Sequence, residues 1–253
     1  MLFVNECLIM FRSFSAHIKK LFARIALISL EMVIVMTLFL IALVVFVFVT
    51  RRVFLQNRTE FDHEVFAYLQ QHVSDRNNDL MQLFTFLGTH EFLIPANLIL
   101  IAYFLFIKKQ KWYSIKIPAI ALSSLGLMVA LKHIFKRPRP DIPLLFEADG
   151  LSFPSGHALM SVTFFGLMIY IVYKTFRNAG WKWLLISLLV ILILIIGFSR
   201  IYLRVHYASD VIAGYCIGFL WLVFTVWLLN RMEKFSRRKF DRVVEQPPLP
   251  ASG

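Results

Sequence analysis

Apolar residues occur in long blocks along this chain, and short polar or charged segments separate the blocks. A helix needs about 20 apolar residues to cross a hydrocarbon core about 30 Å thick. The pattern therefore predicts an all-α integral membrane protein, a six-helix transmembrane bundle. We expect the spans at about residues 25–50, 92–107, 117–135, 157–173, 183–198 and 211–229, with an alternative start of the second span within 80–87.

Two segments outside the spans predict additional surface helices. Residues 1–24 mix apolar and basic positions, as an interfacial amphipathic helix does. In the polar region 51–91, apolar residues recur every four positions: Phe61, Val65, Leu69 and Val73. This spacing is typical of a helix that lies on the membrane surface, here on the extracytoplasmic side. We divide the chain into an amphipathic segment 1–24, a membrane domain 25–230, and a basic, then Pro-rich cytoplasmic tail 231–253.

Composition supports the membrane assignment. Of the 253 residues, 59% are hydrophobic, and the mean hydropathy is +0.71, which is too apolar for an ordinary soluble domain. The net charge of +12 comes mostly from Lys and Arg between apolar blocks, so we expect no nucleic-acid partner. Cys7 and Cys216 lack the spacing of a metal site or a disulfide framework.

The distribution of cations predicts the orientation in the membrane. Four basic segments fall on one side of the six spans: the N-terminal segment, residues 108–116, residues 174–182 and the tail. Cytoplasmic loops carry the excess of Lys and Arg, so both termini should be cytoplasmic. Two short loops on the opposite side break this trend, because they also carry cations: Lys136, Arg137, Arg139, Arg200 and Arg204. A bound anion would explain cations on that side.

Three segments border those two loops: residues 132–140, 153–157 and 199–210. Together they supply Lys, Arg, a Ser hydroxyl, a Gly amide, two His and an Asp, which is the set that phosphoryl transfer uses to position and neutralise the phosphoryl group. Arg binds phosphate oxygens as a planar fork and Lys as a point charge. Ser155, Gly156 and His157 come where a helix begins, and free backbone N–H groups there favour an anion.

His206 and Asp210 are four residues apart, so within one helical turn they would face the same way. Asp210 could then orient the imidazole of His206 and leave its other nitrogen free to attack phosphorus. His157 would be the general acid for the leaving oxygen. Purely structural roles are the alternative. Asp210 would then be a helix N-cap, and three cations at span ends would reach the lipid headgroups: Lys136, Arg137 and Arg204.

These residues resemble the signature of the type 2 phosphatidic acid phosphatase superfamily. Its pattern is K-x6-R-P, then P-S-G-H, then S-R-x5-H-x3-D. In this chain the pattern reads Lys132 to Arg139-Pro140, Pro154-Ser155-Gly156-His157, and Ser199-Arg200 to His206 to Asp210. The order and approximate spacing also agree, and the resemblance covers about residues 80–230.

The resemblance implies a role for each matching residue and a metal-independent enzyme without a cofactor. Lys132, Arg139 and Arg200 would hold the phosphate oxygens, and Ser155 with Gly156 would complete that cradle. His157 would be the acid, His206 the nucleophile and Asp210 its partner. The pocket has several cations and one inner carboxylate, so it offers a divalent cation little.

We therefore expect a phosphatase that hydrolyses a lipid phosphate monoester or pyrophosphate through a phosphohistidine, on the extracytoplasmic face of a bacterial plasma membrane. Candidate substrates are undecaprenyl pyrophosphate, phosphatidylglycerophosphate, phosphatidic acid and the phosphates of lipid A. Alternatives are a lipid-to-lipid phosphotransferase, a vanadate-dependent haloperoxidase, and a transporter or scramblase that uses the same anion pocket. The sequence does not indicate the oligomeric state.

Overall fold

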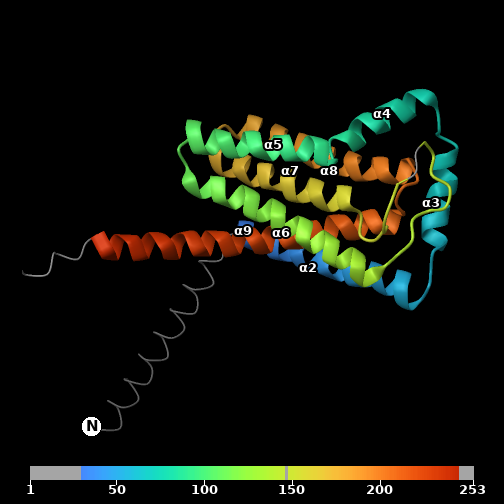
Figure 1. Cartoon of the computed structure of the whole chain (residues 1–253), viewed down its shortest axis with the longest axis horizontal. Helices are drawn as coiled ribbons and strands as arrows, with labels where there is room; N and C mark the ends of the chain where they lie inside the picture. The colour runs from blue at the N-terminus through green and yellow to red at the C-terminus, as the bar shows by residue number, and fades with distance from the viewer. Residues whose placement is uncertain (1–29, 146–147, 245–253) are drawn as a thin grey trace, which may run out of the picture. The chain divides into compact units, whose positions relative to one another are not determined.

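The structure is a computed structural model that describes residues 30–145 and 148–244, and all regular structure within these ranges is helical (Figure 1). Its elements are α2 (Leu30–Thr50), the π-helix η1 (Arg51–Leu55), α3 (Glu60–Gln70), α4 (Asp75–Phe86), α5 (His90–Ala102), the π-helix η2 (Tyr103–Ile107), α6 (Lys111–Phe135), α7 (Gly156–Thr175), α8 (Ala179–Tyr202) and α9 (Ala208–Val244). The predicted amphipathic segment 1–24 lies outside the described residues.

Within the described residues, six stretches of helix are long and apolar enough to cross a membrane: Leu30–Leu55, His90–Ile107, Lys111–Phe135, Gly156–Thr175, Ala179–Tyr202 and Ala208–Arg237. They confirm the predicted number and order of spans. The alternative start of the second span within 80–87 is wrong, because α4 ends there and a turn at Gly88 separates it from α5. The chain forms two compact units, Met1–Ile41 and Ala42–Gly253, and the second contains all three segments that carry the candidate site residues.

Helix α7 is the central packing element of this second unit. It contacts α6, α8 and α9, and its inward face is fully buried over most of its first three turns. Two glycines one turn apart on α9, Gly214 and Gly218, let the α7 backbone approach closely. Small residues at this spacing are the usual means of close helix packing in membranes. The contact fixes the start of α7 beside the start of α9.

A helix, α3, forms where the sequence predicted one, but its buried face differs from the predicted stripe. Val65 and Leu69 face inward as expected, whereas Phe61 and Val73 are exposed. The buried face also includes a carboxylate, Asp62, which is 1% exposed. Hydrophobic periodicity could not find this face, because burial of Asp62 depends on partners that are distant in sequence.

The glycine contact between α7 and α9 yields a stability prediction. A methyl group at Gly218 would lie 2.9 Å from the Leu159 carbonyl oxygen, so the helices would have to move apart. We expect Gly218→Ala to destabilise the protein by about 1–3 kcal/mol, measured by thermal unfolding in detergent. The control is Gly126→Ala on α6, where nothing lies within 4 Å and Ala should stabilise by up to about 1 kcal/mol. Equal effects of the two substitutions would contradict this account of the packing.

Candidate active site

The three segments singled out in the sequence meet at one end of the second unit. The Ser155 amide, just before α7, donates to the Asp210 carbonyl oxygen in α9 at 3.0 Å. The Ser152 amide donates to the Arg137 carbonyl oxygen at 2.8 Å and closes the loop between α6 and α7. Four helix termini therefore lie around the same site: the ends of α6 and α8 and the starts of α7 and α9.

An aromatic cluster anchors the loop that leads into α7. Phe153 is fully buried and packs edge-on against Phe54 and Phe135, with ring centroids 5.0 and 4.9 Å away. Ser152 and Ser155 flank this anchor, and both are fully buried. Ser155 is also the N-cap of α7, because its hydroxyl oxygen accepts from the Ala158 amide. The helix begins where the sequence predicted.

His206 and Asp210 are brought together, but they do not share a helical turn. His206 lies in the loop before α9, and Asp210 lies in the first turn of that helix. The His206 Nδ1 atom is 3.5 Å from Asp210 Oδ2. The Asp210 Oδ2 atom also accepts from the Tyr207 amide at 3.0 Å, at the point where α9 begins. The alternative of Asp210 as the helix N-cap is wrong, because Asp210 is the third residue of α9 and Tyr207 precedes the helix. Its carboxylate reaches back to the Tyr207 amide and also faces the imidazole.

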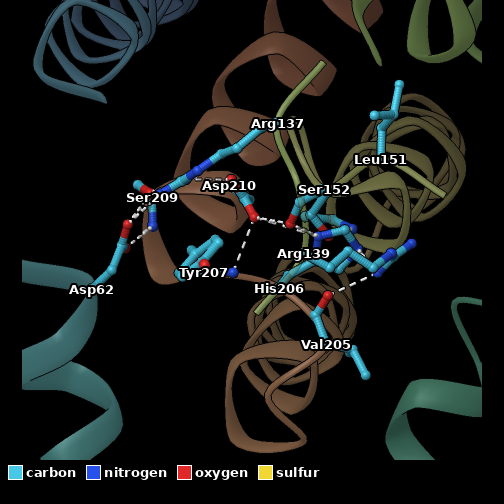
Figure 2. A network of polar contacts seen from close by, with 12 residues as sticks. Asp62, Arg137, Arg139, Leu151, Ser152, Val205, His206, Tyr207, Ser209 and Asp210 are labelled. Carbon is cyan, nitrogen blue, oxygen red and sulfur yellow. Dashed lines mark hydrogen bonds and ion pairs between the residues drawn. The ribbon is translucent and has the colours of Figure 1, made fainter. Parts of the chain in front are cut away.

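A serine that the sequence analysis did not single out connects these two residues. The Ser152 hydroxyl donates to Asp210 Oδ2, and its oxygen lies 3.2 Å from His206 Nδ1 (Figure 2). On the other edge of the ring, Arg139 Nη1 is 3.3 Å from Nε2. Arginine is only a donor, so Nε2 is the acceptor and the proton of neutral His206 is on Nδ1. This arrangement directs the Nε2 lone pair away from Asp210.

Burial lowers the pKa of His206 to about 4, and the charges of Arg139 and Arg200 act in the same direction. Its contact with Asp210 opposes this shift without cancelling it. The imidazole is therefore neutral near pH 7, which is the state that a nitrogen nucleophile requires.

Three cations that the sequence assigned to phosphate binding lie near this imidazole, and backbone or hydroxyl oxygens hold each of them. Lys132 Nζ donates to the Leu151 carbonyl oxygen at 2.7 Å. Arg139 donates to the carbonyl oxygens of Val205, Asp149 and Gly150 at 2.7 to 3.2 Å. Arg200 donates from Nη1 to the Thr85 hydroxyl on α4 at 2.7 Å. No carboxylate contacts these cations at hydrogen-bond distance among the described residues, so their charges remain available.

His157 and Arg200 each carry a buried nitrogen without a hydrogen-bond partner in the described part of the chain. These atoms are His157 Nε2 and Arg200 Nε. Lys132, Arg139, Arg200 and His206 all act electrostatically on His157, so the predicted residues lie around one point. A side chain at Gly88 would come within 2.9 Å of the His157 ring, so the turn before α5 also shapes this pocket.

Gly156, the remaining predicted residue, is the first residue of α7. A methyl group there would lie 2.6 Å from the Met128 sulfur on α6. Packing of α6 therefore supplies a reason for glycine at this position, in addition to the predicted approach of a phosphate.

The sequence analysis missed a buried ion-pair cluster. From the sequence, Arg137 is a cation that binds an anion or reaches the headgroups, yet this residue is 7% exposed and pairs with Asp210 and Asp62. Although burial acts to lower it, Asp210 and Asp62 together raise the pKa of Arg137 above its ordinary value. Ser209 completes the cluster. The position of Arg137 within the K-x6-R-P segment was the one feature of the sequence that pointed to this residue.

The donor set suits an anion better than a metal ion. Within residues 30–145 and 148–244, no group of three or more His, Cys, Asp or Glu side chains has an arrangement that could hold a metal. Asp210, the carboxylate at His206, is already engaged by Arg137, Ser152 and the Tyr207 amide.

The lowered pKa of His206 predicts a pH-dependent stability. An unfolded chain protonates this imidazole near pH 6.5, whereas the folded protein resists protonation down to about pH 4. The unfolded state thus binds more protons between these values, so stability is fully present above pH 6.5 and falls as the pH drops toward 4. The difference is on the order of 3 kcal/mol. We expect the melting temperature of wild type to fall over this pH range relative to that of His206→Asn. If the difference between the two melting temperatures did not change with pH, the lowered pKa of His206 would be contradicted.

This chain is similar to a known protein family and to known proteins. The PAP2 superfamily model matches residues 113–234. Phosphatidylglycerophosphatase B of Bacillus subtilis (strain 168) is 28% identical over 163 residues, which are 64% of this chain and 79% of that protein. The bacitracin transport permease protein BcrC of Bacillus licheniformis is 37% identical over 113 residues, 43% of this chain and 50% of that protein.

The fold also has a solved counterpart. The crystal structure of a transmembrane PAP2-type phosphatidylglycerolphosphate phosphatase from Bacillus subtilis superimposes with a TM-score of 0.67 at 23% identity, covering 78% of this chain and 96% of that one. This likeness confirms the predicted all-helical membrane fold. The chain resembles the PAP2 superfamily, whose model matches just under half of its length, and it shares the helical fold of the PAP2-type structure.

Proposed function

We propose that this protein hydrolyses a lipid phosphate monoester or a lipid pyrophosphate through a phosphohistidine on His206, without a metal ion. The observation that carries the proposal is a neutral, buried imidazole with Arg139 at its Nε2 and with Arg200 also acting on it. Two buried donors, His157 Nε2 and Arg200 Nε, lack partners among the described residues. Burying such donors is costly unless something accepts from them. The oxygens of a bound phosphoryl group would accept from His157 and Arg200.

The reaction would proceed in two displacements. His206 Nε2 attacks phosphorus as the bond to the leaving oxygen breaks, and His157 gives that oxygen its proton. Lys132, Arg139 and Arg200 neutralise charge on the non-bridging oxygens. Water then attacks the phosphohistidine and cleaves the P–N bond, while His157 takes the proton from that water. At the N-terminus of α7, the Gly156 amide and the Ser155 hydroxyl would add to the cradle, because the Ser155 amide already donates to the Asp210 carbonyl oxygen.

An apolar groove supports a lipid as the substrate. It has a volume of about 380 Å³ and is lined by side chains of α8 and α9: Leu194, Ile195, Phe198, Ile201, Val211, Ile212 and Tyr215. Ile201 and Val211 are the residues directly after Arg200 and Asp210, so the groove runs to the catalytic end of both helices. The hydrocarbon chain of the substrate would lie there while the headgroup reaches His206.

The proposed location is a bacterial plasma membrane, with cytoplasmic termini and an extracytoplasmic site. The support is the charge pattern, since two of the cations that violate the positive-inside rule, Arg139 and Arg200, lie near His206. The name of one relative makes phosphatidylglycerophosphate the first substrate to test. Undecaprenyl pyrophosphate, phosphatidic acid and lipid A phosphates follow.

Three alternative functions would use the same anion pocket. A lipid-to-lipid phosphotransferase would pass phosphate from His206 to a lipid hydroxyl, and labelled phosphate would then appear in lipid. A vanadate-dependent haloperoxidase would oxidise halide when vanadate is added, whereas here vanadate should only inhibit. A transporter or scramblase would bind the anion without needing a nucleophile. The relative named as a permease aligns over 50% of its own length.

The substrate prediction is tested with purified protein in detergent and excess chelator. We expect release of inorganic phosphate from at least one long-chain lipid phosphate or pyrophosphate at the rate measured without chelator. Water-soluble esters that lack the chain should react more slowly, because they cannot use the groove. Failure on every lipid, or loss of activity with chelator that added metal restores, would contradict the proposal.

The nucleophile is tested with His206→Asn. We expect turnover to fall by about 10⁴-fold or more, because no other side chain takes over the attack on phosphorus. Wild type quenched in base should carry labelled phosphate that acid releases, as a phosphohistidine does, and His206→Asn should carry none. The matched control is His133→Asn, an exposed histidine at the end of α6 that bonds the Val129 carbonyl oxygen. Full turnover in His206→Asn would remove the assignment.

A further inference from the structure

We propose that Asp62 of α3 and Arg137 are positioning residues for this reaction, because they hold Asp210 in the orientation that directs its Oδ2 toward His206. The inference rests on the proposed roles of His206 and Asp210. Neither Asp62 nor Arg137 contacts the reacting atoms, and both act through Asp210.

The guanidinium of Arg137 bridges two helices. Its Nη1 donates to Asp210 Oδ1 at 2.6 Å and to the Ser209 hydroxyl at 2.7 Å, while Nη2 donates to Asp62 Oδ2 at 2.8 Å (Figure 2). The Tyr207 ring covers it, with the ring centroid 4.0 Å from Cζ. A planar fork with two carboxylates and an aromatic cover has little freedom to rotate.

The contacts of Asp210 divide cleanly between its two oxygens. Oδ1 is taken by Arg137, and Oδ2 faces Ser152, the Tyr207 amide and His206. If Arg137 were absent, the carboxylate could rotate about its last torsion, and its plane would no longer aim an oxygen at the imidazole. The two oxygens are chemically equivalent, so Arg137 acts by fixing the plane of the carboxylate rather than by choosing an oxygen.

Asp62 completes the arrangement from α3. Its Oδ1 accepts from the Ser209 amide at 2.9 Å, and its Oδ2 accepts from the Ser209 hydroxyl at 2.6 Å. Ser209 is in the first turn of α9, where an amide has no partner within the helix and a negative charge is favoured. Asp62 thus fastens α3 to the start of α9 and pins the far side of Arg137.

Formal charge explains why both residues are needed. The cluster of Asp62, Arg137 and Asp210 carries −1 in wild type, from two carboxylates and one guanidinium. Arg137→Gln would leave −2 in a buried space, Asp62→Asn would leave 0, and the double variant would return to −1. Breaking one partner of a buried ion pair is far more costly than removing both.

The test is steady-state kinetics of four variants in detergent with the best lipid substrate: Asp62→Asn, Arg137→Gln, Arg137→Lys and the double variant Asp62→Asn/Arg137→Gln. Rates are expressed per folded molecule in the monodisperse fraction of a sizing column. The matched controls are Glu64→Gln, an exposed carboxylate on the same helix, and Lys136→Gln, the cation beside Arg137 in the chain.

We expect kcat to fall about 10- to 100-fold in Asp62→Asn and Arg137→Gln, with KM changed by less than about threefold, since the phosphate-binding cations are untouched. The double variant should turn over faster than Arg137→Gln, because its cluster regains the wild-type charge. Arg137→Lys should keep part of the rate that Arg137→Gln loses. Both controls should match wild type.

Wild-type kcat in Asp62→Asn or in Arg137→Gln would overturn the proposal, and so would a double variant that turns over no faster than Arg137→Gln. A variant that yields less folded protein but keeps the wild-type kcat per folded molecule also counts against the proposal. His206→Asn is measured in parallel. Turnover in His206→Asn would remove the proposed function, whereas an inactive His206→Asn beside unaffected cluster variants would remove this inference alone.

Discussion

The buried carboxylate of Asp210 is the constraint around which this end of the protein is organised. It has no exposed surface, and a charge taken out of water must be paired and hydrogen-bonded to be tolerated. Arg137, Ser152 and the Tyr207 amide supply that compensation, and each comes from a different place in the loops. Satisfying one carboxylate therefore brings the loop before α7 to the start of α9.

The same requirement explains how the site keeps unneutralised cations. Lys132, Arg139 and Arg200 repel one another, and direct pairing with carboxylates would cancel the charge needed for a phosphoryl group. Main-chain carbonyl and hydroxyl oxygens hold them instead, as dipoles rather than charges. Such fixed donors require no rearrangement when charge develops during phosphoryl transfer. The arrangement needs a loop whose carbonyls point inward, and the buried ring of Phe153 stabilises that loop.

Close packing of helices in the membrane connects this chemistry to the fold. Gly214 and Gly218 bring α9 against α7, and the Ser155 amide bonds the Asp210 carbonyl oxygen. His157, near the start of α7, is thereby placed on the same side as His206. Helix α3 is bound to this end by Asp62, so an element outside the three motif segments takes part in the geometry.

The sequence by itself determined the six spans, the convergence of three segments and the residues at their centre. Apolar blocks and fixed residue spacings are local properties of the chain, so they can be read without coordinates. The tertiary structure alone decided that His206 precedes α9, that Ser152 joins it to Asp210, and that Asp62 is buried. These features depend on partners far away in sequence, such as Arg137, 75 residues beyond Asp62, and periodicity carries no information about such pairs.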